Sequence, residues 1–136
     1  MCHAYEIGVC LVALAMIVAM IPSWSVTANA ASDYGLVVDY AKVTSDRTSG
    51  DGWSYNPTTN TLTLTNYNYS QDGWRYGDYS GGIYCLSNLT IKLIGNNSVN
   101  NTYSYQFNDS CGIYVSGRLT ITGEGSLTTS GGSGVF

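Results

Sequence analysis

Residues 82–91 read Gly-Ile-Tyr-Cys-Leu-Ser-Asn-Leu-Thr-Ile, and residues 112–121 read Gly-Ile-Tyr-Val-Ser-Gly-Arg-Leu-Thr-Ile. The two stretches align without a gap, and six of their positions carry the same residue type. A third copy begins with Gly-Val-Phe at residues 134–136, so that Gly82, Gly112 and Gly134 are equivalent. Self-similarity at a period of roughly 20 to 50 residues is typical of repeat architectures. The sequence therefore predicts a repeated unit whose copies stack on one another.

Short alternating segments indicate that the repeated unit is made of β-strands. Residues 61–65 are Thr-Leu-Thr-Leu-Thr, residues 89–93 are Leu-Thr-Ile-Lys-Leu, and residues 119–122 are Leu-Thr-Ile-Thr. Strict alternation of apolar and polar side chains predicts a half-buried strand, and β-branched Thr suits the solvent face. No segment after residue 32 carries the apolar periodicity of a helix. We expect an all-β protein.

Two short strands and Gly, Asn and Ser turns within each repeat are typical of one coil of a β-solenoid. Successive coils lie about 4.8 Å apart, so equivalent side chains stack. Ile83 is then expected beneath Ile113, and Leu89 beneath Leu119. The expected fold is a parallel β-helix, and the additional residues of its first, longer coil are expected as a loop between residues 96 and 111.

The predicted coils divide the chain after residue 81. Coil 1 covers residues 82–111, coil 2 covers 112–133, and residues 134–136 begin coil 3, so the solenoid is expected to be C-terminally incomplete. Upstream, residues 35–66 contain several short apolar strands around the turn signal Asn56-Pro57. This segment is expected to form a hairpin that caps the N-terminal end of the solenoid, because an uncapped end exposes unpaired strand edges.

Residues 1–30 are interpreted as a secretory signal peptide. Residues 8–21 form an uncharged apolar run, which is short for a transmembrane helix, and the triplet Ala28-Asn29-Ala30 is a small-x-small cleavage pattern. Residues 1–7 lack the Lys or Arg that usually opens such a peptide, so an uncleaved anchor is the alternative. The domain at residues 31–136 is then secreted, extracellular or held at the cell surface.

Two cysteines, Cys85 and Cys111, remain after cleavage at Ala30. An exported pair of cysteines suggests a disulfide. The repeat, however, places Cys111 over Gly81, which lies four residues before Cys85. Four strand residues span roughly 13 Å, and a disulfide needs Cα atoms within about 7 Å. The register therefore favours two separate thiols unless a turn folds between the two positions.

Charge and composition argue against several classes of function. The net charge is −4 with no basic cluster, which makes nucleic acid a poor partner. The single His is His3, and the single Glu of the predicted mature chain is Glu124, which lies between two glycines. A glycosidase needs two carboxylates at a set distance, and a lyase on this fold needs a base beside calcium-bound acids. The sequence therefore favours a protein that is not an enzyme.

The hairpin and the coil together carry a resemblance to a known family. Residues 52–67, Gly-Trp-Ser-Tyr-Asn-Pro-Thr-Thr-Asn-Thr-Leu-Thr-Leu-Thr-Asn-Tyr, are followed by Gly-Ile-Tyr at 82–84, Leu-Thr-Ile at 89–91 and Gly95. In combination they resemble secreted bacterial proteins described as carbohydrate-binding domain-containing proteins, over roughly residues 35–136. The resemblance implies a right-handed parallel β-helix related in fold to pectate lyases, and it implies glycan binding. It points to no particular sugar-contact residue.

Aromatic side chains gather in two segments that are expected to be polar loops, residues 66–82 and 96–110. Aromatic rings stack on the flat C–H faces of sugars, and Asn, Asp and Arg bond sugar hydroxyls. The alternative is that these aromatics bury themselves and close the loops onto the strands. The candidate carbohydrate-binding residues are Trp74, Arg75, Tyr76, Tyr79, Tyr103 and Tyr105.

Calcium is the one metal ion that the sequence leaves open. Asp72, Asp78 and Asp109 lie in the same two segments, and carboxylate oxygens are the ligands that calcium prefers. No EF-hand spacing is present, and scattered Asp residues in loops are more often solvated turn residues, so no metal site or cofactor is expected.

The function expected from the sequence is noncatalytic binding of a plant-type or cell-surface polysaccharide outside the cell. Polysaccharide is the expected partner, with neither nucleic acid nor, after signal cleavage, a membrane. Two alternatives remain open: a structural β-solenoid segment of a bacterial cell-surface adhesin, and a degenerate polysaccharide lyase.

Overall fold

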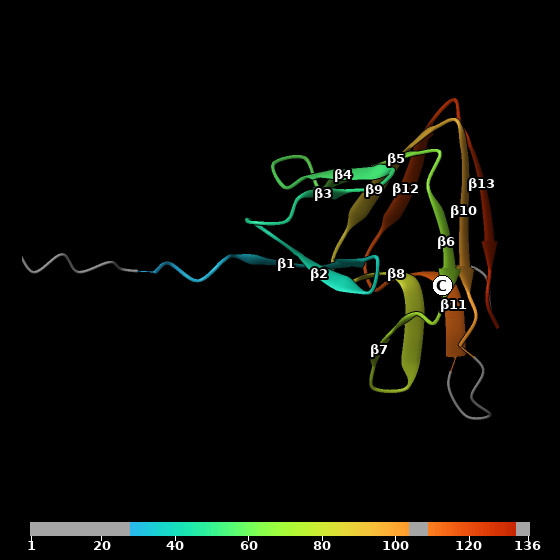
Figure 1. The fold of residues 1–136 in the computed structure, drawn as a ribbon, viewed down its shortest axis with the longest axis horizontal. Coiled ribbons are helices and arrows are strands. Elements are labelled where there is room, and N and C mark those ends of the chain that lie inside the picture. Colours follow the sequence, from blue (N-terminus) through green and yellow to red (C-terminus); the bar gives the residue numbers. More distant parts are fainter. Residues whose placement is uncertain (1–27, 104–108, 133–136) are drawn as a thin grey trace, which may run out of the picture. The chain divides into compact units, whose positions relative to one another are not determined.

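The structure is a computed structural model that describes residues 28–103 and 109–132 (Figure 1). In this part of the chain, thirteen β-strands belong to one unit, Ala31–Phe136. The strands are β1 (Asp33–Val38), β2 (Ala41–Thr44), β3 (Ser49–Gly50), β4 (Trp53–Asn56), β5 (Thr61–Thr65), β6 (Asn68–Gln71), β7 (Trp74–Tyr76), β8 (Tyr79–Cys85), β9 (Leu89–Ile94), β10 (Asn96–Asn101), β11 (Asp109–Val115), β12 (Leu119–Gly123) and β13 (Ser126–Ser130).

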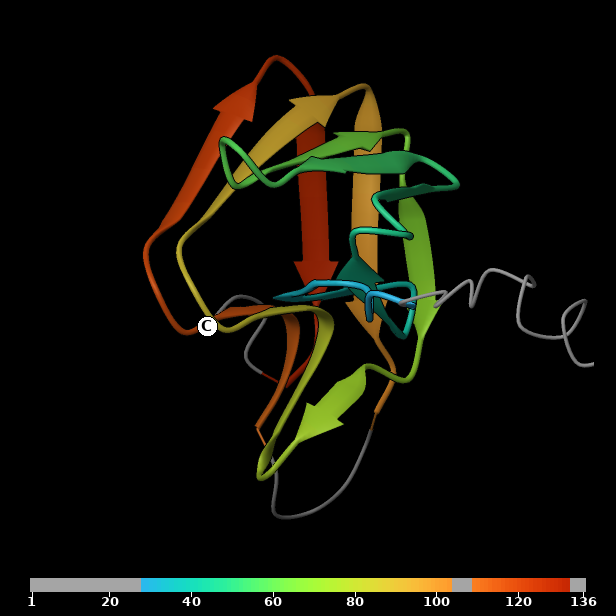
Figure 2. The ribbon, with the colours of Figure 1, turned by 90° about the vertical axis from the view of Figure 1, so that its left-hand side faces the viewer.

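These strands form three sheets around a shared interior (Figure 2). The first sheet has the order β11-β8-β1-β2, with β7 also paired to β8; the second is β13-β10-β6; the third is β12-β9-β5-β4-β3. Every sheet sends buried apolar side chains into one core, which includes Leu36 and Ile83 from the first sheet, Val99 from the second, and Leu62 and Ile91 from the third. The core is what holds the three sheets together, because burying apolar surface is the main stabilising term in folding.

The repeat correctly predicts which strands are neighbours. β8 and β11 run parallel with Ile83 opposite Ile113, and β9 and β12 run parallel with Leu89 opposite Leu119. β10 and β13 are also parallel, with Asn96 opposite Ser126, which continues the same offset. The repeated residues therefore stack in the expected register over the described part of the chain.

The expected right-handed parallel β-helix is nevertheless wrong. Five of the ten pairings between described strands are antiparallel, namely β1–β2, β1–β8, β3–β4, β4–β5 and β7–β8. They make the first and third sheets mixed, and the described strands form no solenoid. The physical reason is that the segment before the first repeat turns back on itself in hairpins, and these hairpins add antiparallel strands to the two sheets.

The hairpin expected around Asn56-Pro57 is present. β4 and β5 pair antiparallel with Asn56 opposite Thr61, and the Asn56 side chain accepts a hydrogen bond from the Thr58 N–H at 3.0 Å, which closes the turn. Asn60 ends the turn with a φ of 49°, in the left-handed region that Asn tolerates. The capping role expected for this segment stays a prediction.

Both segments expected to be loops contain strands instead. Residues 66–82 hold β6, β7 and the beginning of β8, while residues 96–101 form β10. Within the second segment, residues 109–110 belong to β11 and residues 104–108 lie outside the described residues, as do residues 134–136 of the expected third coil.

Cys111 pairs with Gly81 across β11 and β8, as the repeat predicts. Both Cys85 and Cys111 are buried thiols, and no disulfide joins them. None of the described residues belongs to a helix long and apolar enough to cross a membrane.

Candidate functional site

The candidate residues gather around the hairpin of β7 and β8. These two strands pair antiparallel, with Tyr76 opposite Tyr79, so Gly77 and Asp78 form the turn. Gly77 has a φ of 59°, the geometry of the first turn residue of a type II′ hairpin, whose twist matches that of the paired strands. The turn brings Tyr76 and Tyr79 side by side at the end of the first sheet.

Four tyrosines, Tyr76, Tyr79, Tyr84 and Tyr114, form a row that we call the tyrosine patch. Tyr84 and Tyr114 stack with ring centroids 4.7 Å apart and planes 10° apart. The ring centroids of Tyr76 and Tyr84 are 6.0 Å apart, and those of Tyr79 and Tyr114 are 5.1 Å apart. These separations are those of favourable aromatic pairs, each of which contributes roughly 0.5–1.5 kcal/mol beyond its burial.

The tyrosine patch lies on the outer face of its sheet. Ile83 and Ile113 belong to the buried core, and successive side chains of a strand point to opposite faces, so the tyrosines that follow them point outward. Tyr84 is only 3% exposed, and its burial raises the pKa of its hydroxyl. Tyr76 and Tyr79 are 62% and 36% exposed. The patch therefore has a buried base and two accessible rings.

A small pocket of about 200 Å³ borders the tyrosine patch. Lys42 and Asp33 lie on its rim and form an ion pair at 2.7 Å. The hydrogen bond from Lys42 holds the pKa of the Asp33 carboxyl below its usual value. The pocket thus places charged hydrogen-bonding groups next to apolar and aromatic surface. Its lining comprises Asp33, Gly35, Val37, Lys42, Trp74, Arg75, Tyr76, Tyr84 and Leu86.

Five of the six candidate carbohydrate-binding residues are described, and they lie in or beside this region. Trp74, Arg75 and Tyr76 line the small pocket, and Tyr79 belongs to the tyrosine patch. The Arg75 guanidinium lies 4.9 Å from the ring centroid of Tyr103, a cation–π contact. Tyr105 lies outside the described residues.

Trp74 is half-buried, which lies between the exposed and the buried alternatives that the sequence left open. Its ring meets the ring of Tyr40 edge to face, with centroids 5.5 Å apart. Tyr40 lies in the turn between β1 and β2, and 49% of it is exposed. The ring available to solvent at this position is therefore that of Tyr40.

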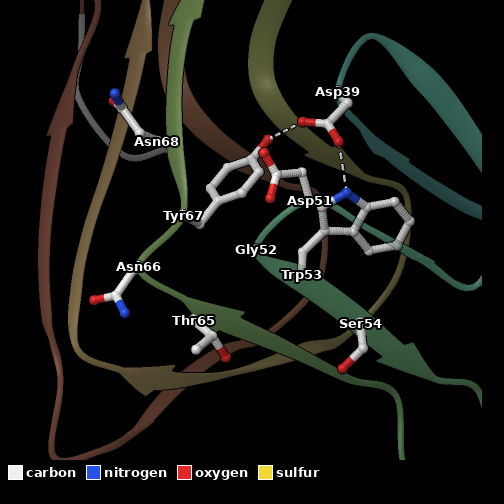
Figure 3. Close-up of a pocket in the computed structure, with 9 residues that line it drawn as sticks. All are labelled: Asp39, Asp51, Gly52, Trp53, Ser54, Thr65, Asn66, Tyr67 and Asn68. Atoms are coloured by element: carbon white, nitrogen blue, oxygen red, sulfur yellow. Dashed lines mark hydrogen bonds between the residues drawn. The ribbon is translucent and has the colours of Figure 1, made fainter.

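A larger pocket of about 680 Å³ lies at the junction of β4, β5 and β6 (Figure 3). Its main feature is the Asp39 carboxylate, which accepts a hydrogen bond from Trp53 Nε1 at 2.5 Å and another from the Tyr67 hydroxyl at 2.7 Å. Trp53 and Tyr67 are 3% and 2% exposed, so their ring faces are unavailable to a ligand. We call these two hydrogen bonds the Asp39 clamp, because they fix the turn that carries Asp39 and Tyr40.

The weak calcium candidates do not form a cluster in the described part of the chain. Asp72 accepts a hydrogen bond from Thr102 at 2.8 Å, and Asp78 is an exposed turn residue. The Asp109 side chain lies outside the described residues. No group of three acidic, His or Cys side chains that could hold a metal ion is found among those that are described.

Tyr40, Tyr84 and Tyr114 are site residues that the sequence analysis missed. Tyr84 and Tyr114 occupy the third position of both repeats, so they carried a usable signal: an aromatic residue on the outer face of stacked strands must stack on its own copy. Tyr40 had no such signal, because its contact with Trp74 joins residues far apart in the sequence.

Comparisons of the chain with protein-family models, with curated proteins and with solved structures found no match.

Proposed function

We propose that the chain binds polysaccharide without catalysis, outside the cell, and that the tyrosine patch is the surface on which the sugar lies. The observation that carries the proposal is the pair of accessible rings of Tyr76 and Tyr79, each packed against a stacked tyrosine beneath it. The resemblance to carbohydrate-binding proteins described above points to the same class of ligand.

The patch suits a sugar for two physical reasons. An aromatic ring offers an apolar, electron-rich face to the C–H groups of a pyranose. Rings that already pack against Tyr84 and Tyr114 have little side-chain freedom to lose on binding, and a smaller entropy cost leaves more of the interaction energy as affinity.

Polar groups beside the patch suit the rim of a sugar. Arg75, Asp33 and Lys42 line the adjoining pocket and supply donors and acceptors for hydroxyl groups. Asp33 and Lys42 neutralise each other as an ion pair, so together they present almost no net charge to an approaching ligand. Arg75 leaves this lining with one positive charge, so a polysaccharide with few or no charges fits this surface better than a strongly cationic one.

The test is retention of the purified protein on insoluble cellulose, xylan and pectin. We expect at least one of these to retain the protein, and we expect a Tyr76→Ala/Tyr79→Ala double variant to lose retention. Ile94→Ser is the matched control, because Ile94 is an apolar side chain on β9 that is 45% exposed and lies outside the patch.

Three outcomes separate the candidate functions. Retention lost in the double variant and kept in Ile94→Ser supports the patch. Equal retention of the double variant and the unchanged protein rejects the patch as the binding surface. Failure of every glycan to retain a protein that circular dichroism shows to be folded favours a structural segment of a surface protein instead.

A further inference from the structure

Tyr40 is displayed in an unusual backbone conformation. It is the second residue of the turn between β1 and β2, where Asp39 has a φ of 55° and Tyr40 a φ of 57°. Turns of this kind usually carry Gly or Asn at the second position, since other side chains are strained there. A large aromatic residue in this position, 49% exposed, costs free energy without burying its ring fully. Residues with a strained backbone at accessible positions cluster at ligand-binding sites.

Two contacts hold the Tyr40 ring in place. The Asp39 clamp anchors the preceding residue to Trp53 and Tyr67 (Figure 3). Trp74 packs edge to face against the ring itself. The ring is therefore positioned before any ligand arrives, which reduces the ordering cost of binding.

Polar groups surround the exposed part of this ring. Tyr40 lines a shallow pocket of about 500 Å³ together with Gln71, Asp72 and Thr102. The Thr102 hydroxyl donates to Asp72 Oδ1 at 2.8 Å, which orients the carboxylate. An amide, a carboxylate and a hydroxyl around one aromatic ring supply both donors and acceptors beside an apolar face. That set of groups matches an uncharged sugar ring, whereas the carboxylate of Asp72 would repel an acidic one.

A short run of backbone links residues that line the pocket at Tyr40 to residues that line the small pocket beside the tyrosine patch. Gln71 and Asp72 line the first pocket, and Trp74 and Tyr76 line the small pocket beside the patch. Trp74 also contacts Tyr40 directly. Residues 71–76 thus connect the two pockets along one run of backbone, and a single extended ligand can contact both.

We infer that Tyr40, Gln71, Asp72 and Thr102 form a second carbohydrate subsite, and that one uncharged glycan chain spans this subsite and the tyrosine patch. The inference rests on the proposed function and adds to it the length of ligand that the protein recognises. It predicts that affinity rises with the number of sugar units until both surfaces are occupied.

The experiment measures the dissociation constants of disaccharides to hexasaccharides by isothermal titration calorimetry, using oligomers of the neutral polysaccharide that retains the protein. Tyr40→Asn is the main variant, because Asn tolerates the left-handed conformation and lacks the ring. Gln71→Ala is the second variant, since it removes one polar contact and leaves the turn intact. Unfolding midpoints establish that both variants are folded.

For the unchanged protein we expect the hexasaccharide to bind at least about tenfold more tightly than the disaccharide. In Tyr40→Asn that gain disappears, and in Gln71→Ala the gain is reduced. The same gain in both variants as in the unchanged protein overturns the second subsite and leaves the tyrosine patch standing. The absence of any gain with length in the unchanged protein overturns the second subsite too, and the absence of all glycan binding overturns both proposals.

Discussion

Replacing Asp39 by Ala tests the contact that joins the N-terminal parts of the three sheets. The Asp39 carboxylate lies in the turn between β1 and β2, and it accepts hydrogen bonds from Trp53 of β4 and from Tyr67, the residue before β6. Both donors belong to nearly fully buried side chains. Burial raises the pKa of the Tyr67 hydroxyl far above its usual value, so this group stays a donor at all ordinary pH values. Without the carboxylate, two buried donors lose their partner.

The expected loss follows from the number and type of these hydrogen bonds. A hydrogen bond to a charged group contributes about 1.5–3 kcal/mol, so the two bonds together give roughly 3–6 kcal/mol. About a third of the Asp39 side chain is exposed, and water that enters the gap will satisfy part of the lost bonding. We therefore expect Asp39→Ala to lower the free energy of unfolding by about 3 kcal/mol. That is a large part of the roughly 5–15 kcal/mol of a typical domain.

Urea unfolding of the purified protein, followed by circular dichroism, measures this loss. Asp39→Asn serves as the control, because Asn tolerates the same positive φ and keeps one acceptor oxygen, so it should lose about half as much. Tyr67→Phe in the Asp39→Ala background should cost less than Tyr67→Phe alone, since the shared bond is already gone. A loss below about 1 kcal/mol for Asp39→Ala, or strictly additive losses in the pair, would show that the clamp does not stabilise the fold.

Three further predictions each concern one residue. Burial raises the pKa of Tyr69 to about 12, whereas an unfolded tyrosine titrates near 10. The contribution of Tyr69 to the unfolding free energy should therefore be constant below pH 10 and fall between pH 10 and 12. Urea midpoints across this range should fall less in Tyr69→Phe than in the unchanged protein, and an identical fall would refute the assignment. Gly95→Ala should lower the unfolding free energy by about 2–4 kcal/mol. Gly95 has a φ of 67°, and a Cβ there would overlap the Asn66 amide, which accepts a hydrogen bond from the Asn96 N–H. An unchanged melting temperature would contradict this prediction. Asn101→Ala should lower the unfolding free energy by a similar amount, since the Asn101 amide makes four hydrogen bonds in a nearly fully buried position; a urea midpoint within error of the unchanged protein would count against it.

The neighbours of each repeated strand could be predicted because the repeat is visible in the sequence itself. Gly-Ile-Tyr and Leu-Thr-Ile recur at a fixed offset, and apolar alternation fixes which side chains face the core. Pairing Ile83 with Ile113 and Leu89 with Leu119 then brings equivalent apolar side chains together. A slip by one residue would turn every apolar side chain outward, so a single register is strongly preferred.

The strands inside the two expected loops could not be predicted in the same way. β6 and β10 read as polar loop segments because Asn and Ser dominate them. The inward positions of β10 include Asn97 and Asn101, whose amides satisfy backbone groups on distant parts of the chain. A buried amide of this kind is stable only when each of its hydrogen bonds has a partner. Those partners come from the tertiary structure, so composition alone predicted loops where the structure has strands.

In the candidate site, too, features set by neighbouring residues could be predicted, and contacts between distant residues could not. Tyr76 and Tyr79 were both candidate binding residues, and they pair across a hairpin whose Gly77-Asp78 turn is local in the sequence. The burial of Trp74 could not be predicted, because Tyr40, which packs against its ring, lies far away in the sequence. Whether an aromatic side chain is covered depends on what the fold brings to it, and a single segment does not contain that information.

The repeat and the candidate site are related through the position of the repeated tyrosine. Because Ile83 and Ile113 point into the core, Tyr84 and Tyr114 point outward on adjacent parallel strands and must stack on each other. Stacking covers one face of each of these two rings, and Tyr84 is nearly fully buried. The β7–β8 hairpin adds the more exposed rings of Tyr76 and Tyr79 to the two ends of this stacked pair. In this arrangement the repeated strands supply the buried base of the tyrosine patch, and the β7–β8 hairpin supplies its exposed rings. The proposed binding surface therefore lies on the antiparallel hairpin and not on the repeated strands alone.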